Sequence, residues 1–190
     1  MPANPITSDE DLMERYRDGD AGAFDVLYGR HKGGVFRYLA RQCGNSGVAE
    51  ELFQEVWMNV IRARATYTVQ AKFTTYLYRV AHNRLIDHYR AHGGGVLASF
   101  DADDGPALDE VPGARGDDPA VSADARQQAR HLLELIDALP AAQREAFLLQ
   151  QESDMSVEEI AQATGVSRET AKSRLRYAVV KLREGMQQLD

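Results

Sequence analysis

The stretch Ser156–Arg176, SVEEIAQATGVSRETAKSRLR, indicates two short helices joined by a tight turn. Ser156 is suited to cap the first helix, and Glu159, three residues later, can complete a capping box. Gly165 supplies a turn position with unrestricted φ, and Ser167 is the natural N-cap of the second helix. The stretch therefore predicts a helix, a glycine turn and a second helix in the C-terminal part of the chain.

The second of these helices has one apolar face and one polar face. Apolar residues recur at helical spacing, at Ala171, Leu175, Ala178, Val179 and Leu182. At about 100° per residue, the opposite face carries Ser173, Arg176 and Tyr177, and the flanks carry Arg168, Lys172 and Arg174. This is the pattern of a DNA-binding helix-turn-helix, in which outward side chains reach base edges and flanking cations contact phosphates. A solvated helical hairpin with ordinary basic residues is the alternative.

Charge is distributed unevenly along the 190 residues, whose net charge is −7. Residues 101–124 hold eight acids and one base, Arg115, which leaves 21 basic and 21 acidic residues in the rest of the chain. Residues 62–92 hold six Lys or Arg and one acid, Asp87. Because local basic surfaces matter more for DNA contact than the total charge, the acidic total does not exclude a nucleic-acid binder.

Cysteine content and hydropathy indicate in which cellular compartment the protein works. Cys43 is the single cysteine, so no internal disulfide can form, which suits a reducing compartment. The N-terminus has no basic-then-apolar signal pattern, and no apolar run approaches membrane-spanning length. We therefore expect a soluble, cytoplasmic protein with no membrane insertion.

The N-terminal part of the chain has helical apolar spacing from Asp9 onward, with Gly19-Asp20 and Gly33-Gly34 as expected breaks or weak points. The clearest amphipathic helix spans residues 48–62, VAEELFQEVWMNVIR. Its outer face carries Glu51, Gln54, Glu55 and Met58. That face is either exposed to plain solvent or a surface for a partner.

A polar loop, ATYTVQAK at residues 65–72, precedes a long helix predicted over residues 73–92. One outward stripe of that helix carries Lys72, Arg79, Asn83 and Arg90, with Tyr76 beside it. Cations neutralise phosphates and aromatic faces stack on unpaired bases, so the stripe suits single-stranded nucleic acid. A solvated basic helix is the alternative.

All of the elements expected from the sequence are helices. Gly93-Gly94-Gly95 ends the long helix, and the acidic sequence that follows is rich in Gly, Pro, Ala and Asp without apolar periodicity. The expected fold class is all-α, with two small helical domains joined by a flexible acidic linker. The expected bounds are residues 9–92 for the first domain, 93–122 for the linker and 123–190 for the second domain, which contains the helix-turn-helix.

Catalytic motifs are missing from the sequence, which has no phosphate-binding Gly loop, Cys cluster or Gly-x-Ser-x-Gly elbow. One enzyme-like feature is the group His82, Asp87, His88 and His92, because adjacent His/Asp pairs occur in metal-dependent phosphohydrolases. His88 and His92 share a helix face, but His82 would point about 120° away from His88. We therefore expect no metal site, no cofactor and no enzymatic activity.

Two segments resemble bacterial sigma-70-family RNA polymerase sigma factors. They are AEELFQEVWMNVI with FTTYLYRVAHNRLIDHYR before the linker, and LPAAQREAFLLQ with MSVEEIAQATGVSRETAKSRLR after it. The short extracytoplasmic-function (ECF) group is the match, because the chain has no room for the extra domains of a housekeeping sigma factor. The resemblance implies that residues 9–92 recognise and melt the promoter −10 element and that residues 123–190 read the −35 element.

The resemblance also implies partners and residue roles. Core RNA polymerase would bind through its β′ clamp helices, against Glu51, Gln54, Glu55 and Met58, and through its β subunit. Single-stranded −10 DNA would meet the base-capturing loop Thr68, Val69, Gln70, Ala71 and Lys72, and then Tyr76, Arg79 and Asn83. Duplex −35 DNA would take Lys172, Ser173, Arg176 and Tyr177 in its major groove, with Arg168 and Arg174 on phosphates. The family further implies an anti-sigma factor that clamps the two domains.

Two departures from the family pattern lie at the −10 site. Tyr76 stands where the family usually has Trp, and TVQAK differs from the Arg-Gly-Asp-like sequence common in that loop. The resemblance therefore does not imply a particular −10 sequence. The alternative function is a stand-alone helix-turn-helix regulator that binds duplex DNA as a dimer, which would explain the C-terminal block but not the stripe before the linker.

Overall fold

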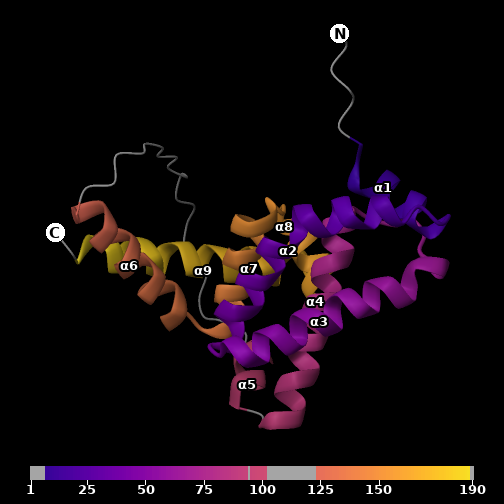
Figure 1. Ribbon diagram of the computed structural model, residues 1–190. Coiled ribbons are helices and arrows are strands. Elements are labelled where there is room, and N and C mark those ends of the chain that lie inside the picture. The colour runs from indigo at the N-terminus through magenta and orange to yellow at the C-terminus, as the bar shows by residue number, and fades with distance from the viewer. Residues whose placement is uncertain (1–6, 94, 102–122, 189–190) are drawn as a thin grey trace.

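Helices make up the regular structure of residues 7–93, 95–101 and 123–188, the part of the chain that the computed structural model describes (Figure 1). They are α1 (Asp9–Arg17), α2 (Ala21–Cys43), α3 (Ser46–Ala63), the 3-10 turn η1 (Arg64–Thr66), α4 (Phe73–His92), α5 (Gly95–Asp101), α6 (Ala123–Ala138), α7 (Ala141–Ser153), α8 (Val157–Thr164) and α9 (Arg168–Gln187). The expected all-α class is confirmed. We call α1–α5 the N-terminal lobe and α6–α9 the C-terminal lobe.

One of the two breaks expected in the N-terminal lobe is confirmed, and the other is wrong. Gly19 follows α1 with a φ of 109°, and the Asp20 side chain caps α2. Gly33 and Gly34, however, lie inside a continuous α2. A Cβ atom at Gly34 would lie 2.7 Å from the hydroxyl oxygen of Tyr78 in α4, so this glycine serves the close approach of two helices and does not end one.

Aromatic side chains fill the contact between α2 and α3. The ring of Trp57 lies 5.8 Å from Phe24 and 5.0 Å from Tyr28, both in edge-on arrangements. Trp57 is 4% exposed, which agrees with the expectation that the apolar face of this helix is buried. The opposite face of α3 is consequently turned away from the core.

The helix-turn-helix has the caps that its sequence predicts. The Ser156 side chain accepts from the Glu159 amide, and Glu159 accepts from the Ser156 amide at 2.8 Å, so the capping box is complete. Gly165 ends α8 with a φ of 69°, and Ser167 caps α9. Of the expected apolar face of α9, Val179 is half-buried, while the buried members are Ala171, Leu175, Ala178 and Leu182.

The first part of the expected linker is helical, so that expectation is wrong for residues 95–101. Val96, Leu97 and Phe100 have the i, i+1, i+4 spacing of one helix face, and Phe100 is buried. The helix α5 that they form packs against α4 and α7. Residues 102–122, the rest of the expected linker, lie outside the described residues.

The two lobes pack directly against each other in this structure. Helix α2 contacts α7, and α8, the first helix of the helix-turn-helix, contacts α4. Figure 1 shows α7 and α8 lying across α2 and α4 at the centre of the molecule. We call this packing the closed arrangement, and it places the promoter-binding candidates of one lobe beside those of the other.

Candidate functional site

The outer face of α3 is exposed along its length, as expected for Glu51, Gln54, Glu55 and Met58. Met58 is 44% exposed, which is unusual for a large apolar side chain. The four residues line a shallow hollow of about 510 Å³ together with Asn59, Arg62 and Arg84. An acidic and amide surface with one exposed methionine and two cations beside it is suited to bind a partner of mixed charge.

The loop at residues 67–72 and α4 border a pocket of about 410 Å³, which we call the strand pocket. It is lined by Ala63, Thr66, Tyr67, Thr68, Gln70, Ala71, Thr75, Tyr76, Arg79 and, from α8, Gln162. The rings of Tyr67 and Tyr76, which both line the pocket, lie 5.4 Å apart in an edge-on arrangement. The hollow is large enough for a nucleobase. Of the residues expected at this site, Val69, Lys72 and Asn83 are exposed but do not line the pocket.

The N-terminus of α4, where the loop ends, is held by α1. Lys72 occupies the N-cap position and makes no capping hydrogen bond through its side chain. The Glu10 carboxylate instead accepts from the Phe73 amide, with an N–O distance of 2.5 Å. A carboxylate at a helix N-terminus satisfies an otherwise unpaired amide and complements the helix dipole, so Glu10 fixes the border of the strand pocket.

Lys72, an expected −10 contact, forms an ion pair with the C-terminal lobe. Its Nζ lies 2.7 Å from Oε1 of Glu159 on α8. This hydrogen bond raises the pKa of Lys72 and lowers the pKa of Glu159. The Lys72 side chain remains 68% exposed, so the cation is engaged but still reachable from solvent.

The candidate DNA-reading residues of α9 differ in accessibility. Lys172 and Arg168 are exposed, and Ser173, Arg176 and Tyr177 are half-buried. Arg168 pairs with Glu158 of α8 at 2.5 Å.

Arg174 was expected on an exposed flank, and the structure contradicts this. Its side chain is 6% exposed, and its guanidinium donates to the backbone oxygen of Phe100. Because the sequence did not predict α5, it could not predict that α5 covers this flank of α9.

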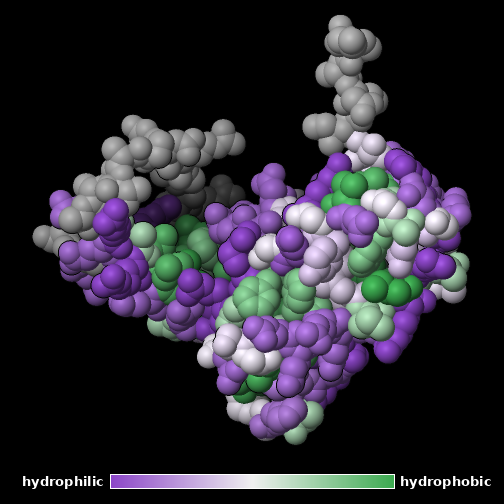
Figure 2. Space-filling model, in the orientation of Figure 1, coloured by the Kyte–Doolittle hydropathy of each residue, from purple (hydrophilic) through white to green (hydrophobic). Residues whose placement is uncertain are grey.

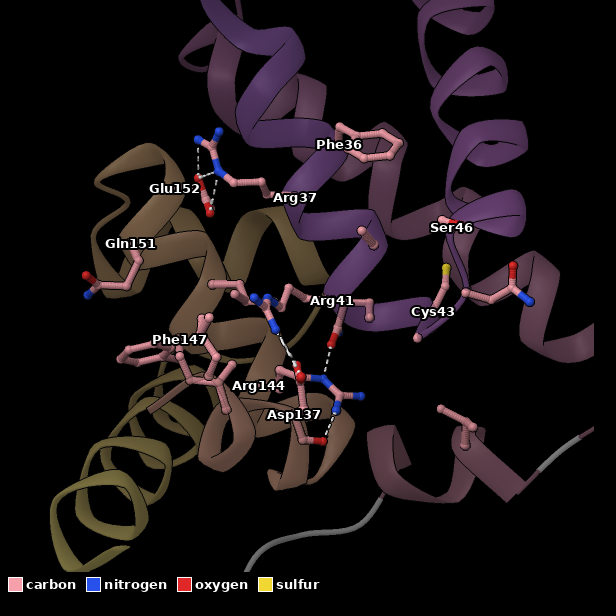
Figure 3. Close-up of a pocket in the computed structure, with 18 of the residues that line it drawn as sticks. Phe36, Arg37, Arg41, Cys43, Ser46, Asp137, Arg144, Phe147, Gln151 and Glu152 are labelled. Atoms are coloured by element: carbon pink, nitrogen blue, oxygen red, sulfur yellow. Dashed lines mark hydrogen bonds and ion pairs between the residues drawn. The ribbon is translucent and has the colours of Figure 1, made fainter. Parts of the chain in front are cut away.

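A groove of about 940 Å³ runs between the two lobes, and we call it the interlobe groove (Figure 3). Its apolar lining includes Phe36, Cys43, Leu132, Leu133 and Phe147. Ion pairs border it, with Arg37 on Glu152 at 2.7 Å and Arg41 on Asp137 at 2.9 Å. Figure 2 shows apolar surface at the centre of the molecule, where α2 meets α7.

The His/Asp group does not come together as a site. His88 and His92 stack at 4.3 Å on α4, but the His82 ring turns to Glu145 of α7, at 2.7 Å. Among the described residues, no group of three or more His, Cys, Asp or Glu is placed to hold a metal ion. No helix in the same residues is long and apolar enough to cross a membrane.

The residues that join the two lobes carry little signal in the sequence. Glu145 is 1% exposed, and one of its oxygens accepts from the hydroxyl of Tyr38 at 2.5 Å as well as contacting His82. Its spacing from Ala142 and Leu149 places a carboxylate on the apolar face of its helix, and this was the available signal. No signal in the sequence paired it with Tyr38, which lies 107 positions away.

Comparison with known families gives two matches, one in each lobe. The description "Sigma-70 region 2" matches residues 27–94, and "Sigma-70, region 4" matches residues 129–182. RNA polymerase sigma factor CarQ of Myxococcus xanthus is 34% identical over 178 residues, which are 94% of this chain and 97% of that protein. ECF RNA polymerase sigma factor SigK of Mycobacterium tuberculosis is 28% identical over 94% of each chain.

Two solved structures share the fold. The structure of CnrH in complex with the cytosolic domain of CnrY superposes with a TM-score of 0.65 at 20% identity, covering 96% of this chain and 99% of that one. Sigma factor RpoE in complex with the anti-sigma factor NepR, from Bartonella quintana, gives 0.63 at 20% identity, covering 86% and 96%. At this identity the likeness establishes the helical fold alone.

Because both lobes match sigma-70 regions and a relative matches over nearly its full length, the chain belongs to the ECF group of the sigma-70 family of RNA polymerase sigma factors. Its function is promoter-specific transcription initiation. The expected family and function are thereby confirmed.

Proposed function

We propose that the outer face of α3 binds core RNA polymerase, at the β′ clamp helices. The observation that carries the proposal is an exposed polar face with Met58 at 44% exposure, on a helix whose other face is buried around Trp57. Exposed side chains on a rigid, well-packed helix present a preformed surface, so binding costs little ordering of the backbone. A second contact with the β subunit belongs to the C-terminal lobe in this proposal.

The double variant Gln54→Ala, Glu55→Ala tests this contact. Both residues are exposed, so the free energy of unfolding should change by no more than about 0.5 kcal/mol while affinity for purified core polymerase falls clearly. Asp25→Ala, which removes one exposed carboxylate from α2, is the control and should bind core polymerase normally. If the double variant binds core polymerase with unchanged affinity, this face is plain solvent-exposed surface and not the polymerase contact.

We propose that the strand pocket receives an unpaired base of the −10 element. Tyr67, Tyr76 and Arg79 line the pocket, and Lys72 directly follows the lining residue Ala71; in this proposal Arg79 and Lys72 are the phosphate partners. Stacking of a base on an aromatic ring is worth about 1–3 kcal/mol, and it becomes available only when the strands separate. Tyr76→Ala should therefore impair promoter opening more than duplex binding, and a pre-melted promoter should restore part of the loss. Equal losses on duplex −35 DNA would contradict this assignment.

We propose that α9 reads the −35 element in the major groove. Arg176 lies opposite the buried face of the helix, where a guanidinium can reach base edges. Arg176→Ala should relax preference at one or two −35 positions by about 1–3 kcal/mol, measured with the holoenzyme on a promoter series. Arg168→Ala is the comparison, because Arg168 is exposed and is expected on a phosphate, and loss of a phosphate contact weakens all sequences alike. If Arg176→Ala weakens binding to all promoters of the series equally, Arg176 contacts phosphates and not base edges.

We propose that the interlobe groove is where an anti-sigma factor binds, as an amphipathic segment. The groove combines an apolar floor with charged pairs at its border, and the solved relative RpoE is in complex with the anti-sigma factor NepR. Leu133 lines the groove and is 42% exposed. The test is capture, by the unaltered chain, of a protein that displaces core polymerase from this chain once it has been purified. Leu133→Asp should abolish this capture. Glu134→Ala, exposed on α6 outside the groove, should leave capture unchanged.

We also propose that the chain acts by binding, without catalysis, in the cytoplasm where RNA polymerase works. The rival function, a stand-alone dimeric regulator, would need a symmetric DNA site and no polymerase. The exposed face of α3 and the strand pocket have no role in that rival. Dependence of specific binding on core polymerase separates the two.

A further inference from the structure

Two hydroxyl groups of residues that line the strand pocket make no hydrogen bond within the part of the chain that the structure describes. In that part, three buried side-chain oxygens lack a partner, and two of them are Oη of Tyr67 and Oγ1 of Thr75. Tyr67 is 6% exposed and Thr75 is 3% exposed. A buried polar group without a partner costs free energy, so a ligand that supplied the missing partners would gain affinity from them.

The ring packing of Tyr67 does not require its hydroxyl. The edge-on contact with the ring of Tyr76 could be made equally well by a phenylalanine. In the same way, a valine would fill the volume of Thr75 without burying a hydroxyl. Because each hydroxyl is a cost to the fold and makes no hydrogen bond among the described residues, we expect its role to lie in binding.

The loop that begins at Tyr67 is held at both ends by α1. Arg17 donates to the Tyr67 backbone oxygen at 3.3 Å, and the Glu10 carboxylate accepts from the Phe73 amide at the start of α4. Thr75 lies in the first turn of α4, two residues after that amide. Both hydroxyls therefore belong to backbone that is anchored before a ligand arrives, which lowers the cost of ordering the site on binding.

Hydroxyl groups are suited to read the edge of a nucleobase, because each can donate one hydrogen bond and accept others. Burial raises the pKa of Tyr67 to about 12, so this phenol keeps its proton at neutral pH and remains a donor. Gln70 and Arg79 also line the pocket, but both are exposed. Exposed polar groups exchange partners with water at little cost, so they discriminate between bases less than buried groups do.

We propose that Tyr67 and Thr75 are the specificity-determining residues of the strand pocket, and that their hydroxyls select the captured base through its hydrogen-bonding edge. The inference rests on the proposed function of the pocket and names the groups that read the base. The ligand is an unpaired nucleobase, held by its edge as well as by stacking. The loop residues 68–72, to which the family resemblance assigns base capture, then border the base, and the residues on either side of them read it.

Tyr67→Phe in the holoenzyme tests the phenol hydroxyl. The probe is a pre-melted promoter in which each unpaired −10 base is replaced in turn by the other three bases and by an abasic site. The abasic replacements identify the position whose base contributes most to binding. At that position Tyr67→Phe should reduce the preference for the best base by about three- to tenfold, the contribution of one ordinary hydrogen bond, and leave the other positions unchanged.

Thr75→Val tests the second hydroxyl and should reduce the preference at the same position by a similar factor. Because the Tyr67 hydroxyl makes no hydrogen bond among the described residues, Tyr67→Phe should not lower the midpoint of thermal unfolding. An unchanged base preference in one folded variant would remove that residue from the reading groups. Unchanged preferences in both would overturn the proposal.

Two variants of α4 are matched controls. Tyr89→Phe removes a hydroxyl that donates to the Gln42 backbone oxygen at 2.6 Å, so it should lower the unfolding midpoint and leave the base preference unchanged. Thr74→Val makes the same change one position before Thr75, at a residue that does not line the pocket, and should also leave the preference unchanged. If the controls lose the base preference as the test variants do, general loosening of α4 is the cause and the proposal is overturned.

The abasic replacements separate failure of this inference from failure of the proposed strand site. If no single abasic replacement weakens holoenzyme binding, the pocket captures no base and both proposals fail. If one position responds but its base preference survives in Tyr67→Phe and Thr75→Val, the pocket stands as a base site and reading by these two hydroxyls is refuted.

Discussion

Gly34 illustrates how a single residue can serve packing between distant helices. The Cβ position at Gly34 lies 2.7 Å from the Tyr78 hydroxyl oxygen and 3.5 Å from the Glu152 backbone oxygen. Tyr78 is 1% exposed, so its ring has little room to move aside. The residue therefore lies where α2, α4 and the end of α7 come together.

Gly34→Ala should destabilise the chain by about 1–3 kcal/mol, the cost of overpacking a well-filled site. Gly29→Ala is the matched control in the same helix, with open space around its Cβ. Helix propensity alone should make Gly29→Ala stabilising by up to about 1 kcal/mol. Urea unfolding measures both, and a stabilising Gly34→Ala would contradict the close approach of α2 and α4.

Cys43 is predicted to be an unreactive thiol. Burial raises its pKa to about 11, and the thiolate is the nucleophile. A raised pKa reduces the thiolate fraction at every pH below it, so reaction with iodoacetamide at pH 8 should be at least about tenfold slower in the folded chain than in urea. The rate should still rise above pH 9. A plateau below pH 9, or equal rates in both states, would show that the thiol is exposed.

At the scale of single elements, α4 depends on α1 for its start. Glu10→Ala should leave the Phe73 amide without its acceptor and cost about 0.5–2 kcal/mol, the usual value of a helix cap. Hydrogen exchange at Phe73 should quicken, and strand binding by the holoenzyme should weaken. Glu14→Ala, on the same helix but paired with Arg17 at the surface, is the control. If the Phe73 amide exchanges equally fast in the two variants, Glu10 is not the cap of α4.

Sequence reasoning succeeded for elements whose determinants are local. The caps at Ser156 and Ser167 and the turn at Gly165 each depend on residues within four positions, and all three are confirmed. It failed for α5, because seven residues among glycines and acids carry a weak pattern that Phe100 fulfils by burial against other helices. The misplacement of Arg174 follows from that failure.

In the candidate site, too, the features that depend on local sequence were predicted correctly and those that depend on distant residues were not. Periodicity correctly predicted the exposure of Glu51, Gln54, Glu55 and Met58, because the facing of an amphipathic helix is encoded locally. The pairing of Lys72 with Glu159 joins positions 87 residues apart by sequence number. A pairing across such a distance depends on how the lobes pack, which no local pattern specifies.

At the scale of the whole molecule, the closed arrangement gives the free sigma factor surfaces of different availability. The face proposed to bind polymerase, on α3, is open, whereas the strand pocket is lined partly by α8 and Arg174 is covered by α5. We expect a corresponding order of events, in which polymerase binds first and promoter DNA engages both lobes afterwards.

This order is tested most directly by a DNA protection experiment. The promoter is first selected from genomic fragments with the reconstituted holoenzyme. We expect no sequence-specific protection by the free chain or by core polymerase alone, and protection of both the −10 and −35 elements when the two are combined. Tight, sequence-specific protection of a palindrome by the free chain, unchanged by core polymerase, would contradict the account and favour the dimeric regulator.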